Sequence, residues 1–322
     1  MPRPEPSTIP AAGFYTVADS NFFPGVVALL NSLRVVGHEE PLFVLDCGLD
    51  RAQREMLAPH ATLVSAPSGA HPVMLKWRAP LTHPAQVMVL LDADMIITRP
   101  LNDLLEGAAA GRIVAFESGV DRFFPEWGDL LGLGTSQRHR YLNAGAVAVS
   151  RGVGMELLEL LRDGLSKVDV NRGWYSVLEP SYPFWLLEQD VLNAVLSARF
   201  ADRLAPLELR LAATFPFEGV DLVDEATLRC AHQDGVEPYL LHHIWHKPWL
   251  TVTPENVYSR LLTRLLVNSD VALRLPKHDL PLRLRGGLLA SLERKRVGLQ
   301  GRRALAKRME DRQRILARLS VE

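Results

Sequence analysis

Short apolar runs alternate with helix-like segments along the first part of the chain, and this alternation limits the folds open to it. Residues 13–18, 42–45 and 61–64 have the length and composition of strands, and between them apolar residues recur at helical spacing from 26 to 33. Strands joined through helices pair in parallel. The pattern therefore predicts βαβ units around a mostly parallel sheet, with ligands bound beyond the carboxyl ends of its strands.

The clearest predicted strand, residues 87–91 (VMVLL), is followed at once by the triplet Asp92-Ala93-Asp94. Side chains at i and i+2 of a strand point the same way, about 6 to 7 Å apart, so both carboxylates can face one cation. Carboxylates and water are ligands that magnesium and manganese prefer. A bare Asp-x-Asp is as readily a solvated turn. Two carboxylates at the mouth of a buried strand, however, repel each other unless a cation or donors compensate, and this favours a metal site.

A second polar cluster lies in the sequence LLHHIWHKPW, residues 240–249. An apolar run leads into His242 and His243, and Lys247 follows. Imidazole is a common metal ligand, and a lysine supplies positive charge for phosphate. Single histidines are usually structural or solvated, so the cluster indicates more than its members do. Its spacing alone does not show that it meets Asp92. Further on, Thr253 predicts the N-cap of a helix that closes the domain near residue 267.

Composition is that of an ordinary soluble globular chain, with 322 residues, 48% of them hydrophobic and 23% charged. Cys47 and Cys230 lie far apart, which excludes a disulfide framework or a zinc-binding cysteine pair and favours a reducing cytoplasm. Residues 1–12 are interpreted as a disordered leader without the apolar region of a signal peptide. No apolar stretch reaches the roughly 18 to 20 residues that a membrane span needs. The expected location is the cytoplasm.

Charge is distributed unevenly along the chain. Its formal net charge is −1, but residues 281–322 contain twelve Lys or Arg and four Asp or Glu, a local balance of +8. Leucines recur at near-helical spacing in this region, at Leu284, Leu288, Leu289 and Leu292 and again at Leu305, Met309, Leu316 and Leu319. We therefore predict a basic amphipathic helical tail over 269–322 that contacts an anionic membrane surface. A solvated helix, or one packed on a second subunit of a homo-oligomer, is the alternative. The acidic remainder gives no reason to expect nucleic-acid binding.

Several motifs, taken in order, resemble family 8 glycosyltransferases of the GT-A fold, which include bacterial lipopolysaccharide galactosyl- and glucosyltransferases and glycogenin. They are VADSNFF, PVMLKWRAPL, LDADMII, YLNAGAVAVS, LEQDVLN and HHIWHKPW. The resemblance covers roughly residues 13–265. It implies a Rossmann-like nucleotide-diphospho-sugar transferase fold over 13–268, with a mixed, mostly parallel central sheet followed by the tail.

The resemblance also implies roles for single residues around a UDP-sugar donor. Ala18, Asp19 and Asn21 would contact the uracil and ribose, and Lys76 would lie near the donor in a helix before the Asp-x-Asp triplet. Asp92 would bind manganese, or magnesium, and would also approach the ribose.

On the sugar side, the resemblance places Asn143 and Ala144 against the donor sugar, and Glu188 and Gln189 opposite the group that is transferred. Lys247 would contact the diphosphate. Glu188 replaces the family's usual aspartate, and its longer side chain shifts the expected contact with a sugar hydroxyl, which leaves the donor sugar open.

The metal-binding histidine departs from the family pattern HxxGxxKPW. Asp92 and Asp94 match, but His242 precedes Lys247 by five residues instead of six, and His243 precedes it by four. We expect His242, which ends the apolar strand, to join the two aspartates, with His243 as the alternative.

The implied reaction is transfer of a hexose from a UDP-sugar to a glycan, lipid-linked or other hydroxyl acceptor, with retention of configuration. The sequence favours front-face attack stabilised by Gln189, with Glu188 as nucleophile the lesser alternative. Aromatic residues in 121–128 and 174–185 are expected on the acceptor side, and the enzyme in the cytoplasm or on the inner face of the cell membrane. The alternatives are an inactive carbohydrate-binding or scaffold protein on the same fold, or a haloacid-dehalogenase-type phosphatase, whose later motifs we do not find.

Overall fold

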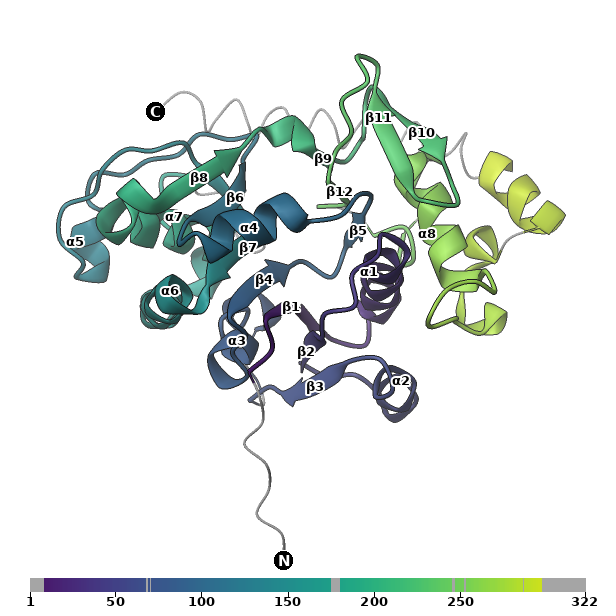
Figure 1. Cartoon of the computed structure of the whole chain (residues 1–322), viewed down its shortest axis with the longest axis horizontal. Helices are drawn as coiled ribbons and strands as arrows, with labels where there is room; N and C mark the ends of the chain where they lie inside the picture. The colour runs from purple at the N-terminus through teal and green to yellow at the C-terminus, as the bar shows by residue number, and fades with distance from the viewer. Residues whose placement is uncertain are drawn as a thin grey trace, which may run out of the picture.

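The computed structural model describes residues 9–67, 69, 71–174, 180–244, 247–251, 253–285 and 287–296. Its centre is a seven-stranded sheet in the order β3-β2-β1-β4-β7-β6-β8 (Figure 1). The strands are β1 (Ala12–Ala18), β2 (Leu42–Asp46), β3 (Thr62–Ser65), β4 (Val87–Leu91), β6 (Ile113–Glu117), β7 (Leu142–Ser150) and β8 (Leu204–Leu207). Strand β7 runs antiparallel to β4 and β6, and the other neighbours are parallel. The predicted mixed, mostly parallel sheet is confirmed.

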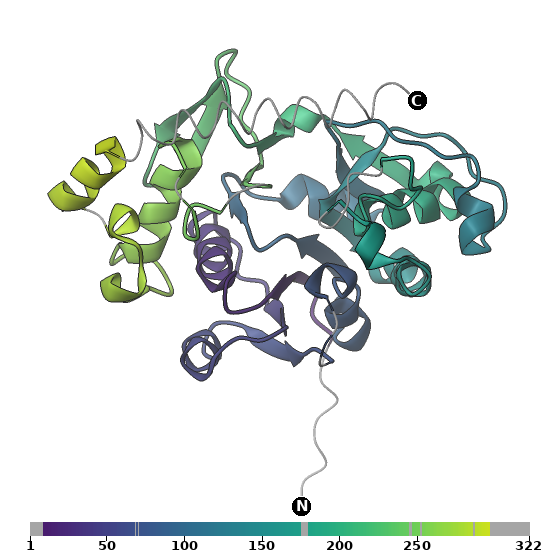
Figure 2. The same ribbon diagram turned by 180° about the vertical axis from the view of Figure 1, so that it is seen from behind.

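Helices cover both faces of this sheet, as Figures 1 and 2 show from opposite sides. One core cluster joins the sheet to α1 (Phe23–Val35), α2 (Arg51–Leu57), α4 (Asn102–Ala109) and α8 (Val257–Val267). A second joins it to α3 (Arg78–Thr82), α5 (Trp127–Leu131), α6 (Arg151–Leu165) and α7 (Glu188–Arg199). Alternate residues of β4 belong to alternate clusters, and all five are buried. Burial on both faces explains why this strand is a continuous apolar run.

A smaller sheet brings distant parts of the chain together. It consists of β5 (Met95–Ile97), β12 (Leu240–His242) and β9 (Ala212–Thr214). Its register places His242 opposite Met95, the residue that follows Asp94. Neither β9 nor the hairpin of β10 (Val220–Asp224) and β11 (Arg229–His232) was expected from the sequence. The remaining elements are the 3₁₀ helices η1 (Pro72–Met74), η2 (Val170–Arg172), η3 (Ala201–Arg203), η4 (Leu209–Leu211), η5 (Lys277–Asp279) and η6 (Leu282–Leu284).

The start of α8 differs from the prediction. The helix begins at Val257, and Asn256 is its N-cap. The Asn256 side chain accepts from the Ser259 amide at 2.9 Å, and the Ser259 hydroxyl accepts from the Asn256 amide at 3.0 Å. This reciprocal capping box satisfies two donors at once. The prediction of Thr253 as N-cap is therefore wrong.

Residues 269–285 and 287–296, here called the C-terminal segment, pack on the domain beyond α8. Asn31 of α1 donates to the carbonyls of Leu265 and Leu273, both at 2.7 Å, and accepts from the Leu273 amide at 2.9 Å. Leu280 and Leu284 are buried. These contacts tie the start of the segment to the first helix of the fold.

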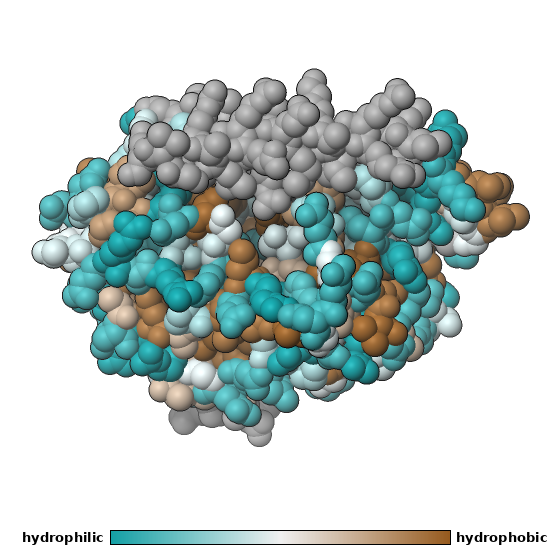
Figure 3. Space-filling model, turned by 90° about the horizontal axis from the view of Figure 1, so that it is seen from above, coloured by the Kyte–Doolittle hydropathy of each residue, from teal (hydrophilic) through white to brown (hydrophobic). Residues whose placement is uncertain are grey.

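Residues 287–296 form a helix with an exposed apolar face. Leu288, Leu289 and Leu292 are exposed on it, whereas Ala290 is buried. Hydrophobic side chains gather at the right-hand edge of the space-filling view, the side on which this helix lies (Figure 3). The rest of the predicted tail, residues 297–322, lies outside the described residues. Within the described part of the chain, no helix combines the length and the apolar character needed to cross a bilayer.

Candidate metal and donor site

Two carboxylates and one imidazole converge at the carboxyl end of β4. Asp92 and Asp94 belong to the turn between β4 and β5, and His242 ends β12. The His242 Nε2 atom lies 3.4 Å from Asp92 Oδ2 and 3.2 Å from Asp94 Oδ1. One candidate ligand atom from each residue lies within 4.8 Å of the other two. Oxygen and imidazole ligands in this number suit a divalent cation such as manganese or magnesium.

Gly145 on β7 makes this convergence possible. Its carbonyl accepts a 2.8 Å hydrogen bond from the Asp92 amide, so the two backbones lie side by side. A Cβ atom at this position would lie 2.7 Å from the His242 ring, the Asn143 side chain and the Met95 methyl. Real Cβ atoms do not approach that closely, so His242 occupies space that only glycine leaves free.

Each aspartate has its own lysine. The Lys76 ammonium lies 2.6 Å from Asp92 Oδ1 and donates to the Ala144 carbonyl at 2.8 Å. Lys76 lies between η1 and α3, so the helix predicted around it is interrupted at this residue. The Lys247 ammonium pairs with Asp94 Oδ2 and donates to the His243 carbonyl at 2.5 Å. The cluster is therefore flanked by two positive charges.

These lysines decide the charge of the aspartates. Burial raises the pKa of Asp92, but Lys76 and then His242 outweigh it and hold that pKa below its ordinary value. Burial likewise acts to raise the pKa of Asp94, but Lys247 and then His242 outweigh it and hold that pKa well below its ordinary value. Burial lowers the pKa of His242, but Asp94 and Asp92 reverse this and the net shift is upward. Both carboxylates are therefore held in the ionised form, which is the form that a cation would need.

His243 lies outside this cluster. Its ring packs against Phe215, Tyr258 and Phe217, with centroid distances of 4.6, 5.0 and 5.7 Å. Both ring nitrogens are buried and have no hydrogen-bond partner among the described residues. Burial, with Lys247 nearby, lowers the pKa of this ring to about 3, so it is neutral. Of the two alternatives left by the sequence, the arrangement favours His242 as the ligand.

The two residues that the sequence placed on the sugar side, Glu188 and Gln189, lie at the start of α7. Glu188 is buried, and its Oε1 atom lies 3.4 Å from the Lys76 ammonium. Gln189 accepts from the Ala144 amide at 3.3 Å and approaches the Ser118 hydroxyl at 3.4 Å. Lys76 therefore links the metal cluster to the glutamate. Burial raises the pKa of Glu188 to about 7 even though Lys76 opposes the shift.

The backbone enters α7 through Leu187, whose φ of 51° and ψ of −116° are unusual for a branched residue. A hydrogen-bond network around Asp190, not expected from the sequence, holds this entry. Asp190, fully buried, accepts from Tyr141 at 2.6 Å, from Arg122 at 3.0 Å and from the Leu186 amide at 2.6 Å. The sequence could have indicated this network, because Asp190 lies among apolar residues of a helix and a buried charge needs hydrogen-bond or ionic partners.

Three of the aromatic residues expected on the acceptor side have a different role. Trp127, Tyr182 and Trp185 are at most 8% exposed and belong to the second core cluster. Trp127 donates to the Pro183 carbonyl at 2.8 Å, which joins the two segments. These side chains therefore build the core beneath α7, and their assignment to the acceptor side was wrong. Residues 175–179 lie outside the described part of the chain.

The residues predicted for the nucleotide lie at the end of β1. The Ala18 carbonyl accepts from the Cys47 amide at 2.8 Å. Asp19 accepts from the Asn21 amide at 2.9 Å, and the Asn21 carbonyl accepts from the Trp249 indole at 2.7 Å. Trp249 follows the lysine of the metal cluster by two residues, so the predicted nucleotide and diphosphate residues are joined. Asn143, on β7, accepts from the Gly145 amide at 2.6 Å.

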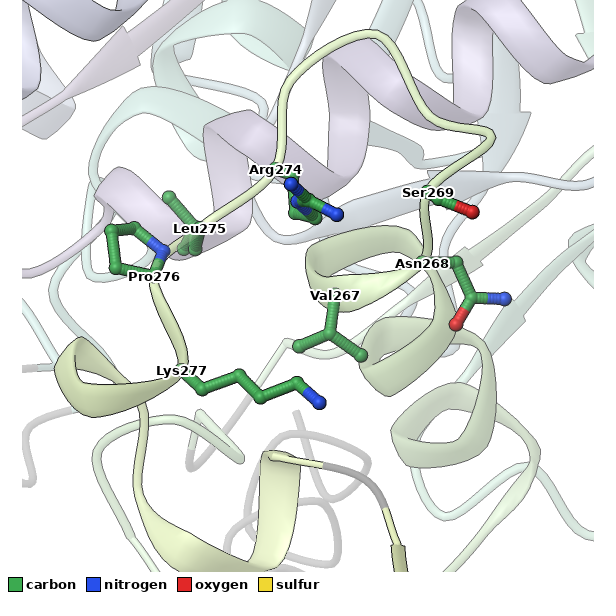
Figure 4. Close-up of a pocket in the computed structure, with 7 residues that line it drawn as sticks. All are labelled: Val267, Asn268, Ser269, Arg274, Leu275, Pro276 and Lys277. Carbon is green, nitrogen blue, oxygen red and sulfur yellow. The ribbon is translucent and has the colours of Figure 1, made fainter.

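A separate recess of about 650 Å³ lies at the end of α8 (Figure 4). It is lined by Val267, Asn268, Ser269, Arg274, Leu275, Pro276 and Lys277. None of the predicted site residues lines it. It supplies two cations but no carboxylate, so it is not the metal centre.

Comparison with known proteins relates the chain to others by structure alone. No family model matches the sequence, and no curated protein sequence matches it. An active-site mutant of the galactosyltransferase LgtC is similar with a TM-score of 0.54 at 15% identity, over 83% of this chain and 98% of that one. The apo structure of the bifunctional glycosyltransferase WbbM gives 0.53 at 14% identity, over 83% of this chain and 51% of that one.

The apo form of the glycosyltransferase GlyE from Streptococcus pneumoniae TIGR4 gives a TM-score of 0.52 at 16% identity, over 80% of this chain and 60% of that one. The chain thus spans nearly all of LgtC but only about half to three fifths of WbbM and GlyE. At these identities the likeness concerns the fold. The chain has the GT-A-like fold of these glycosyltransferases, which is the fold class that its motifs predicted.

Proposed function

We propose that this protein is a metal-dependent glycosyltransferase that moves a hexose from a UDP-sugar to a hydroxyl acceptor with retention of configuration. The observation that carries the proposal is the convergence of Asp92, Asp94 and His242, flanked by Lys247, at the strand ends of a GT-A-like sheet. That is the edge at which ligands bind in open α/β sheets.

The leaving diphosphate is the group that this end of the site serves. Asp92, Asp94 and His242 would hold manganese or magnesium, which supplies positive charge to the departing phosphates. Lys247 pairs with a carboxylate that the cation would also contact, so its ammonium would help to neutralise a diphosphate oxygen held there. Ala18 and Asp19, joined to this loop through the turn at Asn21, would bind the uracil and ribose.

The transferred sugar lies, in this proposal, between β7 and α7. Asn143 and Ala144 form one wall, and Glu188 and Gln189 the other. The Glu188 carboxylate is buried and lies close to the Lys76 ammonium. This environment suits a hydrogen bond to a sugar hydroxyl better than nucleophilic attack on the sugar. Gln189 is half-buried beside the Ala144 amide. The arrangement supports front-face attack, with the Gln189 amide and backbone dipoles stabilising the positive charge that develops on the sugar.

The acceptor and the location extend the same proposal. Of the proposed acceptors, a glycan, lipid-linked or other hydroxyl, the lipid-linked one best suits the predicted basic tail, because its lipid would hold it at the membrane surface that the tail would contact. The exposed Leu288, Leu289 and Leu292 beside arginines and a lysine support contact with that surface.

Ligand-induced thermal stabilisation tests the proposal directly. We expect UDP, or a UDP-sugar, to raise the melting temperature only when manganese is present, and GDP to do so less. Asp94→Asn should abolish the manganese-dependent shift and the hydrolysis of donor. Asp234→Asn, which alters a surface carboxylate paired with Arg210, should change neither. Unchanged donor hydrolysis by Asp94→Asn would contradict the proposal. A manganese-dependent UDP shift with no turnover of any UDP- or GDP-sugar would favour the inactive binding protein.

A further inference from the structure

The turn that carries Lys247 is held from two sides. Within the turn, the Lys247 carbonyl accepts from the amides of Leu250 and Thr251 at 3.0 and 2.9 Å. On one side, the Trp249 indole donates to the Asn21 carbonyl at 2.7 Å. This contact fixes the turn to the loop after β1. The other side of the turn faces the C-terminal segment.

Arg283, in η6 of the C-terminal segment, forms hydrogen bonds with this other side of the turn. Its Nε and Nη2 atoms donate to the Pro248 carbonyl at 3.1 and 2.7 Å, and Nη2 also donates to the Thr251 carbonyl at 3.1 Å. One guanidinium therefore spans both ends of the turn. Arg283 is itself held in place, since the adjacent Leu284 is buried and Arg294 donates to the Arg283 carbonyl at 2.9 Å.

We propose that Arg283 is a positioning residue for the donor diphosphate, acting through Lys247. A lysine side chain is long and flexible, so the place of its ammonium depends on how firmly its backbone is fixed. The planar fork of Arg283 fixes that backbone next to Pro248. The C-terminal segment is then part of the diphosphate site, although its sequence was predicted to be a separate tail. The inference rests on the proposed function, in which Lys247 contacts the diphosphate.

Binding of UDP and of uridine, each in the presence of manganese and measured by calorimetry, tests this role. We expect Arg283→Ala to weaken UDP binding about tenfold, the scale of one hydrogen bond to a charged group, and to leave uridine binding unchanged. The UDP affinity of Arg283→Lys should lie between those of the wild type and Arg283→Ala, because a single ammonium cannot reproduce the hydrogen bonds of the planar guanidinium. The matched control is Arg285→Ala. Arg285 donates to carbonyls of its own segment, Leu280 at 2.7 Å and His278 at 3.4 Å, and among the described residues it makes no hydrogen bond to the turn. Arg285→Ala should change the binding of neither UDP nor uridine.

A double-mutant cycle separates positioning from general loss of structure. Lys247→Ala removes the group that Arg283 is proposed to position, so adding Arg283→Ala should weaken UDP binding no further. Additive losses, equal losses of UDP and uridine, or UDP binding by Arg283→Lys as tight as in the wild type would each overturn the inference. If Arg283→Ala does not fold, Arg283→Lys carries the cycle. If the wild type binds no UDP with manganese, the proposed function itself fails.

Discussion

The two ends of the proposed donor site bury carboxylates in opposite electrostatic states. The metal end consists of Asp92, Asp94 and His242, and the sugar end of Glu188 and Gln189. At the metal end, Asp94 contacts both Lys247 and His242, and its pKa lies below the ordinary value despite burial. At the sugar end, Glu188 is buried to a similar degree, yet its pKa is raised to about 7. The difference comes from the supply of cations. A carboxylate keeps its charge in a protein interior only where a positive group is close enough to offset desolvation.

Lys76 shows how one cation is divided between the two ends. Its ammonium lies 2.6 Å from Asp92 and 3.4 Å from Glu188. Because it is farther from Glu188, it offsets the desolvation of that carboxylate less completely. The metal end is therefore charged throughout the neutral range, as cation binding requires, whereas the sugar end changes its protonation near neutral pH.

Removal of the shared lysine should have the largest effect on stability. Lys76→Met leaves Asp92 and Glu188 without their common cation, and breaking a buried ion pair from one side costs about 3 kcal/mol. Lys167→Met is the control, because Lys167 is exposed and donates to the Leu131 carbonyl, and it pairs with no carboxylate among the described residues. Its loss should cost about 1 kcal/mol. Urea unfolding of both variants gives the comparison. Equal, small losses would mean that Lys76 does not hold the two ends together.

The next effect concerns the metal end alone. His242→Ala should weaken manganese binding by about 100-fold, a loss as large as that seen when residues supporting a metal site are removed. His243→Phe should leave manganese affinity unchanged, because its ring packs among Phe215, Phe217 and Tyr258 and has no hydrogen-bond partner among the described residues. An aromatic replacement fits that environment. Isothermal calorimetry with manganese distinguishes the two histidines, and a large loss in His243→Phe would reverse the choice.

Much of the fold was predictable because its strands are buried on both faces. Residues 87–91 form β4 as predicted. The parts that were missed are short and depend on distant partners. Strand β9 has three residues and pairs with β12, more than 25 positions away in the chain. Local patterns do not encode such pairings.

In the site, too, the residues set by a local pattern were predictable, and those that depend on distant partners were not. Asp92 and Asp94 were predictable because the strand before them sets their spacing. The choice between His242 and His243 was not, since neighbours in a strand point to opposite faces and spacing does not say which face meets the metal. Pairing of His242 with Met95 supplies that information. Arg283 was missed for the same reason, because its partners at Pro248 and Thr251 are brought to it only by the fold.

The smallest expected effect lies at the sugar end and depends on pH. The pKa of Glu188 in the folded protein is about 7, above its ordinary value of 4.5. The folded state therefore binds this proton more tightly than the unfolded state, and the stability it contributes below pH 4.5 is lost as pH rises toward 7. One pKa unit corresponds to about 1.4 kcal/mol. Glu188→Gln removes this dependence, so the variant should gain at least about 1 kcal/mol relative to the wild type between pH 5 and pH 8.

Urea unfolding at the two pH values measures this gain as a difference between two proteins. His242, whose raised pKa also makes stability fall as pH rises, is present in both, so its contribution cancels. Glu117→Gln, which alters a carboxylate paired with Arg140, is the control and should follow the wild type at both pH values. Parallel pH profiles for Glu188→Gln and the wild type would show that Glu188 is ionised like the aspartates of the metal end. The contrast between the two ends would then be lost, and Lys76 would have to neutralise both carboxylates equally.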